Sequence, residues 1–199
     1  MEKFANFNDP ITGQNPFAPL PLKQPTLLRA VHLIYRVPLF ILFLIGINTV
    51  PMLITIKCTR TAYKKMVCNS VSVFDTFVLR HLFPGHAQLY DVNAFTEYDG
   101  AAILFIEECA SNGKMVTKFK SDVRCDGALF MKYSNECVYV MGSMLQFYWR
   151  FLMCDGRVSV KVCELRHSGE YARVIGVAKS VLGVNEKNKF LAKTGRAKQ

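Results

Sequence analysis

The chain has 199 residues, enough for one folded domain and a membrane segment but too few for two full domains. Its net charge of +10 does not come from the middle of the chain, because residues 67–183 carry twelve basic and twelve acidic side chains. Nucleic-acid-binding domains usually carry basic side chains on the fold itself, so this distribution argues against nucleic acid as a partner. The excess positive charge at 57–66 and 184–199 favours anionic lipid headgroups instead.

The beginning of the chain differs in composition from the rest. The first 25 residues contain five of the eight prolines among mixed polar residues, which predicts an extended N-terminal arm over 1–25. Residues 26–36 mix apolar side chains with Arg29, His32 and Arg36, a pattern typical of a helix that lies at a membrane interface.

Residues 37–56 form an apolar run that contains no charged side chain. As a helix the run would rise about 30 Å, the thickness of the hydrocarbon core of a bilayer, so we expect a membrane segment over 26–57. Four residues interrupt the second half of the run: Gly46, Asn48, Thr49 and Pro51. A single kinked span and a monotopic hairpin that bends near 48–51 are therefore both open. A buried helix of a soluble protein is less well supported, because such helices are usually shorter and carry a polar stripe.

Two features predict on which side of the membrane the rest of the chain lies. Basic residues follow the apolar run closely at 57–66, and the positive-inside rule then places the following domain in the cytoplasm. The seven cysteines are odd in number and show no CxxC spacing, which predicts reduced thiols rather than disulfides or a zinc site.

We expect residues 58–183 to form one domain, followed by a basic tail over 184–199. Its first part contains a short predicted strand at 66–69 and an apolar-rich predicted helix at 71–83, which Pro84 and Gly85 close. The continuous apolar run at 101–106 predicts a buried strand.

The second part of the domain contains a further predicted strand at 137–141 and a predicted amphipathic helix at 169–182. Between them, residues 145–153 and 157–165 flank an Asp-Gly pair, which predicts a β-hairpin. Buried strands that alternate with helices indicate an α/β fold. We expect a mostly parallel mixed sheet with flanking helices.

The first candidate site lies where the strand at 66–69 meets the following helix. Asn69, Ser72 and Asp75 would crowd a helix N-terminus, where backbone N–H donors lack partners. The alternative is structural: Ser70 or Ser72 caps the helix, and Asp75 complements its dipole.

The second candidate site follows the strand at 101–106. That strand delivers Glu107 to a loop that ends in Asn112 and Gly113. The alternative here is an ordinary strand end that carries solvated carboxylates.

Together with the arm, these stretches resemble the PlsC-type glycerolipid acyltransferases, which carry N-H-x-S-x-x-D after one strand and F-P-E-G-T after another. The first motif would comprise Asn69, Ser70, Ser72 and Asp75. The second would comprise Phe105, Ile106, Glu107, Glu108 and Cys109, closed by Ser111, Asn112 and Gly113. The arm is similar to that of the fungal members that use lysophosphatidate and oleoyl-CoA, and the shared residues are Met1-Glu2-Lys3, Asn6, Asp9, Thr12-Gly13, Pro16-Phe17 and Pro19.

The resemblance implies a glycerophosphate-acyltransferase-like fold and the transfer of an acyl group from acyl-CoA to a lysophospholipid such as lysophosphatidate. It implies membrane lipids and acyl-CoA as binding partners and requires neither a metal nor a bound cofactor. The expected location is the endoplasmic reticulum membrane or the lipid-droplet surface, with the domain facing the cytoplasm. Ser70 and Asp75 would hold the catalytic positions. The substrate-binding positions would be Asn69, Ser72, Glu107, Glu108, Asn112 and Gly113.

Three features depart from the family pattern. Ser70 replaces the histidine that takes a proton from the lysolipid hydroxyl, and a serine hydroxyl is too weak a base near neutral pH. Glu108 replaces a glycine that lets the backbone approach a phosphate. Thirty-one residues separate Asp75 from Glu107, fewer than the family usually has.

These departures leave two functions open. The chain is either an acyltransferase with an unusual base, for which His81 and His86 are the nearest histidines in sequence, or a non-catalytic relative that acts as a membrane or lipid-droplet scaffold.

Overall fold

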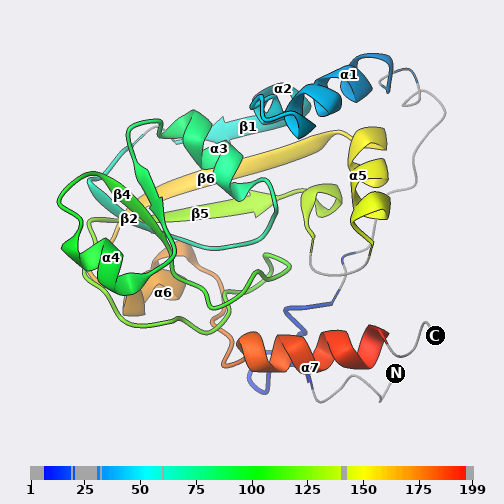
Figure 1. The fold of residues 1–199 in the computed structure, drawn as a ribbon. Helices are drawn as coiled ribbons and strands as arrows, with labels where there is room; N and C mark the ends of the chain where they lie inside the picture. The colour runs from blue at the N-terminus through cyan, green and yellow to red at the C-terminus, as the bar shows by residue number, and fades with distance from the viewer. Residues whose placement is uncertain are drawn as a thin grey trace.

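Six strands form one mixed sheet in the computed structural model, which describes residues 7–18, 20, 31, 33–59, 61–139 and 143–195 (Figure 1). The strand order is β1-β6-β5-β2-β4-β3, and every neighbouring pair is parallel except β5 and β6. The strands are β1 Ile54–Cys58, β2 Lys65–Cys68, β3 Ala87–Leu89, β4 Ala102–Phe105, β5 Gly127–Tyr133 and β6 Gly156–Glu164. The predicted α/β class, with a mostly parallel mixed sheet and flanking helices, is confirmed.

Helices cover both faces of this sheet. Successive strand residues point to opposite faces, so Met66 and Cys68 of β2 join one core and Val67 joins the other. The first core contains side chains of α1, α2, α3 and α5, and the second contains side chains of α4 and α6. The helices are α1 Leu33–Leu44, α2 Val50–Leu53, α3 Asp75–Leu82, α4 Val92–Glu97, α5 Met144–Met153, α6 Tyr171–Ile175 and α7 Val184–Gly195.

The apolar run at 37–56 is not one helix. α1 ends at Leu44, the chain turns at Gly46 with a φ of +95°, and α2 follows after the turn. The last residues of the run belong to β1, which pairs with β6. Among the described residues no helix combines the length and the apolar character that crossing a bilayer requires. The expected spanning helix is therefore unsupported. Residues 1–6, 19, 21–30 and His32 of the predicted arm and membrane segment lie outside the described residues.

The hairpin predicted around Asp155 and Gly156 is wrong. Residues 145–153 belong to helix α5, in which Phe147 and Phe151 face the core at helical spacing while Trp149 is exposed. The second predicted strand, 157–165, is confirmed as β6. Its antiparallel partner is β5, which precedes helix α5 in the sequence.

Several boundaries also differ from the predictions. The helix expected over 71–83 begins only at Asp75, because the preceding residues form a turn. The helix expected over 169–182 is limited to a 3-10 turn, Ser168–Glu170, and α6, which ends where Gly176 adopts a left-handed φ of +73°.

The strand predicted over 137–141 is not present at its described residues. A 3-10 turn, Asn135–Cys137, occupies its start, and residues 140–142 lie outside the described residues. The predicted basic tail forms helix α7 up to Gly195, and residues 196–199 again lie outside the described residues.

Candidate functional site

The two motif segments lie side by side at the carboxyl ends of adjacent parallel strands. β2 pairs with β4, and Cys68 lies opposite Phe105. Beyond the strands, the N–H of Ile106 donates to the Cys68 carbonyl at 3.0 Å, and the N–H of Ser111 donates to the Ser70 carbonyl at 3.0 Å. This is the edge of an open α/β sheet at which ligands usually bind.

Glu107 joins the two segments through a buried carboxylate. Its Oε2 accepts the Ser70 N–H at 2.6 Å, and its Oε1 accepts the N–H and the hydroxyl of Thr117 at 2.6 and 3.2 Å. Burial raises the pKa of Glu107 to about 7, although these donors lower it in part and the nearby negative charge of Asp75 raises it further. The alternative of a solvated carboxylate is therefore wrong for Glu107.

Asp75 opens α3 and turns its carboxylate back over the preceding turn. Its Oδ2 accepts the N–H groups of Val71 and Ser72 at 2.8 and 3.1 Å. Burial raises the pKa of Asp75 to about 7, while these donors and the Tyr133 side chain lower it. Among the described residues the Oδ1 atom of Asp75 has no hydrogen-bond partner, and the Tyr133 hydroxyl donates to the sulfur of Met131 at 3.9 Å.

Ser70 contacts Glu107 through its backbone N–H, and among the described residues no histidine forms a hydrogen bond with Ser70. His81 is exposed on α3, and the Nε2 atom of His86 lies 2.9 Å from the Tyr63 carbonyl oxygen. Within the described ranges no hydrogen bond links either histidine to Ser70 or Asp75. Neither histidine is placed to replace the base of the family motif.

Asn69 and Ser72 use their polar atoms to hold neighbouring backbone. The Asn69 side chain donates to the Met131 carbonyl at 2.9 Å and accepts the Met131 N–H at 2.8 Å. The Ser72 hydroxyl donates to the Cys137 carbonyl at 2.6 Å. Both side chains are buried, so their geometry is that of structural ties rather than of groups presented to a substrate.

Glu108 and Gly113 shape the loop of the second motif. The carboxylate of Glu108 lies 3.8 Å from Lys118 Nζ and accepts the Val184 N–H at 3.3 Å, so it faces the start of α7. Gly113 has a φ of +74°, and a Cβ there would lie 3.3 Å from a methyl group of Val71. Glycine at this position lets the loop pass close to the segment of the first motif.

Asn112 ties the same loop to the N-terminal arm. Its amide donates to the carbonyls of Asn15 and Ala18 at 3.0 and 3.1 Å, and its N–H donates to the Pro16 carbonyl at 2.8 Å. The described part of the arm is therefore not extended as predicted. It folds back on itself around Asp9, whose carboxylate accepts the N–H groups at positions 11 and 12.

The arm and α7 close over this loop together, a contact that sequence analysis missed. The rings of Phe7 and Phe17 lie 5.3 and 6.3 Å from the ring of Phe190 in α7. Figure 1 shows the described part of the arm running beside α7. Lys187 of α7 also donates to the Ala110 carbonyl at 2.7 Å. Phenylalanines in both the arm and the basic tail are the sequence signal that could have predicted this contact.

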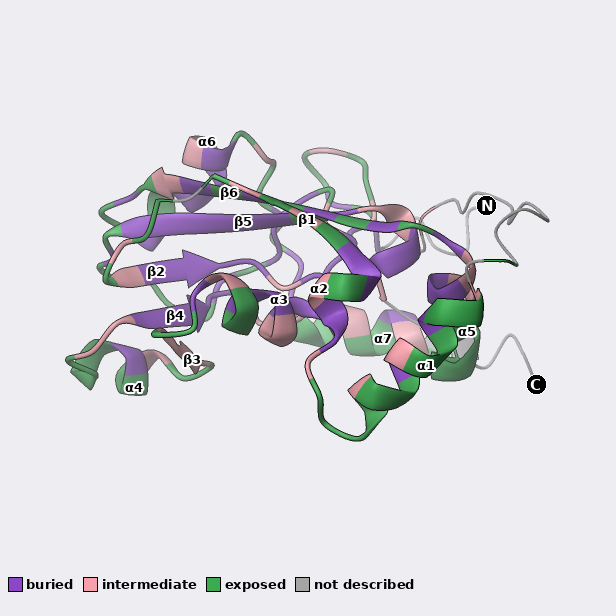
Figure 2. Cartoon of the chain, turned by 90° about the horizontal axis from the view of Figure 1, so that it is seen from above, coloured by how far each residue is buried: buried purple, intermediate pink, exposed green. Residues whose placement is uncertain are grey.

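A second candidate surface lies on α1 and α5, which pack against each other through Phe40 and Tyr148 with ring centroids 4.9 Å apart. α1 buries a narrow stripe that includes Arg36 and Phe40, and most of its remaining apolar surface is exposed (Figure 2). We call the exposed apolar side chains of α1, the following turn and α5 the apolar platform: Ile34, Val37, Ile41, Leu42, Leu44, Ile45, Ile47, Met144, Leu145 and Trp149.

Arg36 fixes α1 to the domain beneath the apolar platform. Its guanidinium donates to the carbonyls of Leu53, at 2.8 Å, and Cys154, and lies 3.6 Å from the Asp155 carboxylate. Arg36 is only 2% exposed, so this contact orients α1 with its apolar surface outward.

Comparisons of the chain with family models, curated proteins and solved structures found no match. Within the described ranges, no group of three or more His, Cys, Asp or Glu side chains is placed to hold a metal ion. The acyltransferase resemblance and the roles it implies therefore stay predictions.

Proposed function

We propose that the chain is a peripheral membrane protein that keeps an acyltransferase-like framework and binds lipid surfaces without transferring acyl groups. The observation that carries this proposal is the apolar platform. A helix that faces water carries polar residues on its outer face, whereas the only charged residue of α1 is the buried Arg36. Exposed apolar surface of this kind marks an interaction site.

A lipid surface fits the platform better than water does. Burying an exposed Leu or Ile side chain contributes about 1.5–3 kcal/mol, so a few inserted side chains are enough for stable adsorption. Trp149 lies within the platform, and tryptophan is favoured at the interface between lipid and water. The surface would be that of the endoplasmic reticulum or of a lipid droplet, with the domain on the cytoplasmic side. This is a monotopic arrangement.

The motif segments support a role without catalysis. The carboxylates of Asp75 and Glu107 and the side chains of Asn69 and Ser72 accept or donate hydrogen bonds within the protein itself. Ser70 supplies no base, so the acyltransferase-like framework would serve as a scaffold.

The test uses Trp149, the single tryptophan, as a reporter on the platform. The full chain is mixed with phosphatidylcholine vesicles, with and without phosphatidate, and its emission and flotation are measured. We expect a blue shift and co-flotation. The variant Ile41→Glu with Leu145→Glu should bind about tenfold more weakly or worse, because charge enters the platform.

Ile11→Glu is the matched control, since Ile11 is also exposed but lies in the arm. It should float like the parent chain. Equal flotation of the parent and the platform variant, both folded by circular dichroism, would overturn the proposal.

Acyl transfer is the second candidate function, and one observation favours it. Two buried carboxyl groups with pKa values of about 7 lie at the meeting point of the motifs, and a general base works best with a pKa near the working pH. The chain would move an acyl group from acyl-CoA to a lysophospholipid, with no metal or bound cofactor. Incubation with oleoyl-CoA and lysophosphatidate tests this, because turnover that Asp75→Ala abolishes would establish the enzyme.

A further inference from the structure

A groove of about 460 Å³ lies along α5, at the α5 part of the apolar platform. Four described side chains line it, and they come from two successive turns of this helix: Leu145, Gln146, Trp149 and Arg150. Residues four positions apart are neighbours on a helix surface. Leu145 and Trp149 therefore form an apolar row, and Gln146 and Arg150 form a polar row beside it. The groove volume lies within the range typical of small-molecule sites.

The apolar row of the groove faces away from the protein. Leu145 is 79% exposed and Trp149 is 58% exposed, although both side chains are large and apolar. The other side of α5 is buried, because Phe147 and Phe151 belong to the first core. Tryptophan is favoured at the boundary between lipid and water. A lipid layer that contacts the platform would therefore meet this groove near the depth of its headgroups.

The polar row contains one charged group, and its orientation is fixed. The Nε atom of Arg150 donates to the Gln146 carbonyl at 3.1 Å, so the guanidinium lies back along α5. Among the described residues the terminal nitrogens Nη1 and Nη2 have no hydrogen-bond or ion-pair partner. Arg150 therefore borders the groove with donors that the protein itself does not use.

No acidic side chain competes for this guanidinium on the helices that carry the platform. In α1, α2 and α5 the only charged side chains are Arg36 and Arg150. The acidic residue closest to α5 in the sequence is Asp155, whose carboxylate lies 3.6 Å from the buried guanidinium of Arg36. The free donors of Arg150 are therefore available to an anion from outside the chain.

We propose that this groove binds one anionic phospholipid, whose phosphate is held by Nη1 and Nη2 of Arg150. An acyl chain of the same lipid would lie against Leu145 and Trp149. The proposal rests on the lipid-surface function proposed above and adds the class of lipid. A guanidinium matches two phosphate oxygens in geometry and charge. The long stem of an arginine can also follow an apolar surface while its charge stays among the headgroups.

The experiment compares the full chain and its variants on two kinds of vesicle, phosphatidylcholine alone and phosphatidylcholine partly replaced by phosphatidylglycerol. Affinity is measured by flotation and by Trp149 emission. Arg150→Gln should bind the phosphatidylglycerol vesicles about fivefold more weakly than the parent chain, the factor expected for one arginine at an anionic surface. It should bind phosphatidylcholine vesicles like the parent chain, because the apolar row is unchanged.

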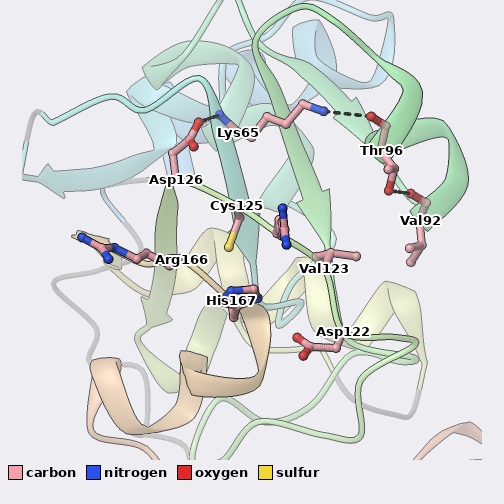
Figure 3. A pocket seen from close by; sticks show the side chains of 10 residues that line it. Lys65, Val92, Thr96, Asp122, Val123, Cys125, Asp126, Arg166 and His167 are labelled. Atoms are coloured by element: carbon pink, nitrogen blue, oxygen red, sulfur yellow. Dashed lines mark hydrogen bonds between the residues drawn. The ribbon is translucent and has the colours of Figure 1, made fainter.

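Arg166→Gln is the matched control. The chain is basic overall, so anionic vesicles attract every cation, and the control measures this general effect. Arg166 is exposed and lies beyond the far end of β6, where it lines a different cavity (Figure 3). The nine residues of β6 separate that end from α5 by about 30 Å. Arg166→Gln should therefore bind both kinds of vesicle like the parent chain.

A second variant, Arg150→Lys, tests the paired contact. It keeps the charge without the fork of donors, so it should weaken binding to phosphatidylglycerol vesicles, by less than Arg150→Gln does. Binding equal to that of the parent chain would overturn the paired contact.

Two further results would overturn the proposal, with all variants folded by circular dichroism. One is equal binding of the parent chain to both kinds of vesicle, and the other is an equal loss in Arg150→Gln and Arg166→Gln. In both cases flotation with phosphatidylcholine would leave the lipid-surface function standing. A parent chain that floats with neither kind of vesicle would contradict the lipid-surface function itself, and this proposal with it.

Discussion

The Glu107 carboxylate accepts the backbone N–H of Ser70 at 2.6 Å and thereby links the two motif segments. The acyltransferase resemblance predicts that both residues face a substrate instead. The same carboxylate reaches Thr117 with its other oxygen. A group that binds backbone on both sides is a cross-link of the fold. Its protonation state should therefore influence stability, whatever else the site does.

The first prediction concerns pH. Burial raises the pKa values of Asp75 and Glu107 from ordinary values near 4 to about 7. Between pH 4 and pH 7 the folded state therefore keeps protons on these carboxyl groups, whereas the unfolded state has released them. The free energy of unfolding should therefore fall as pH rises from about 4 to about 7, by an amount on the order of a few kcal/mol. Urea unfolding at a series of pH values measures this.

The variant Asp75→Asn with Glu107→Gln supplies the control for that experiment. Amides do not titrate, so the difference in unfolding free energy between parent and variant should change with pH across this range. Parallel curves for the two proteins would mean that neither carboxyl has a raised pKa.

The second prediction concerns Gly113. Gly113→Ala should lower the free energy of unfolding by about 1–2 kcal/mol, because its φ of +74° is strained for an L-residue and the new methyl would press on Val71. Gly85→Ala is the matched control, since a Cβ there meets nothing within 4 Å. Denaturant melts of both variants decide the matter, and an equal effect of the two would contradict the strain argument.

The third prediction concerns Asn112 and the arm. Asn112→Ala removes two side-chain hydrogen bonds to the arm, so backbone amides of residues 7–18 should exchange with solvent about tenfold faster. Hydrogen exchange followed by mass spectrometry measures this. Asn93→Ala, at an exposed position on α4, should leave the arm protected, and an unchanged arm in Asn112→Ala would rule out this role of the amide.

The fourth prediction concerns Arg36. Arg36→Met leaves the carbonyls of Leu53 and Cys154 without this donor, and it should cost about 3 kcal/mol of unfolding free energy. Arg80→Met removes an exposed arginine and should change stability by less than about 0.5 kcal/mol. Similar unfolding midpoints for the two variants would show that α1 does not depend on this contact.

The fold class was predictable because the decisive strands carry a local signal. The apolar runs that became β2 and β4 are continuous and short, and the alternation in β6 has a period of two. From the adjacency of such strands, the meeting of the segments after Cys68 and after Phe105 could be expected. The hydrogen-bond partners of the polar side chains in these two segments could not be predicted, because they depend on which side chains the fold buries.

Other elements were not predictable for specific physical reasons. Asp155 and Gly156 have the turn chemistry of a hairpin, but the aromatic residues before them pack at helical spacing, and tertiary packing decides between these signals. Charge-free length suggested a spanning helix at 37–56, whereas Gly46 with its left-handed conformation and the pairing of β1 divide that run. The charge of residues 184–199 predicted a tail, whereas Lys187 donates to the Ala110 carbonyl in the middle of the chain and Phe190 packs against Phe7 at its other end.

The packing of Phe7 and Phe17 against Phe190 also has a consequence for synthesis. The arm is synthesised before its aromatic partner in α7, because all strands of the sheet lie between them in the sequence. The loop that Asn112 anchors to the arm can therefore reach its final packing only after α7 has emerged from the ribosome. Until then Phe7 and Phe17 are accessible to chaperones on the nascent chain.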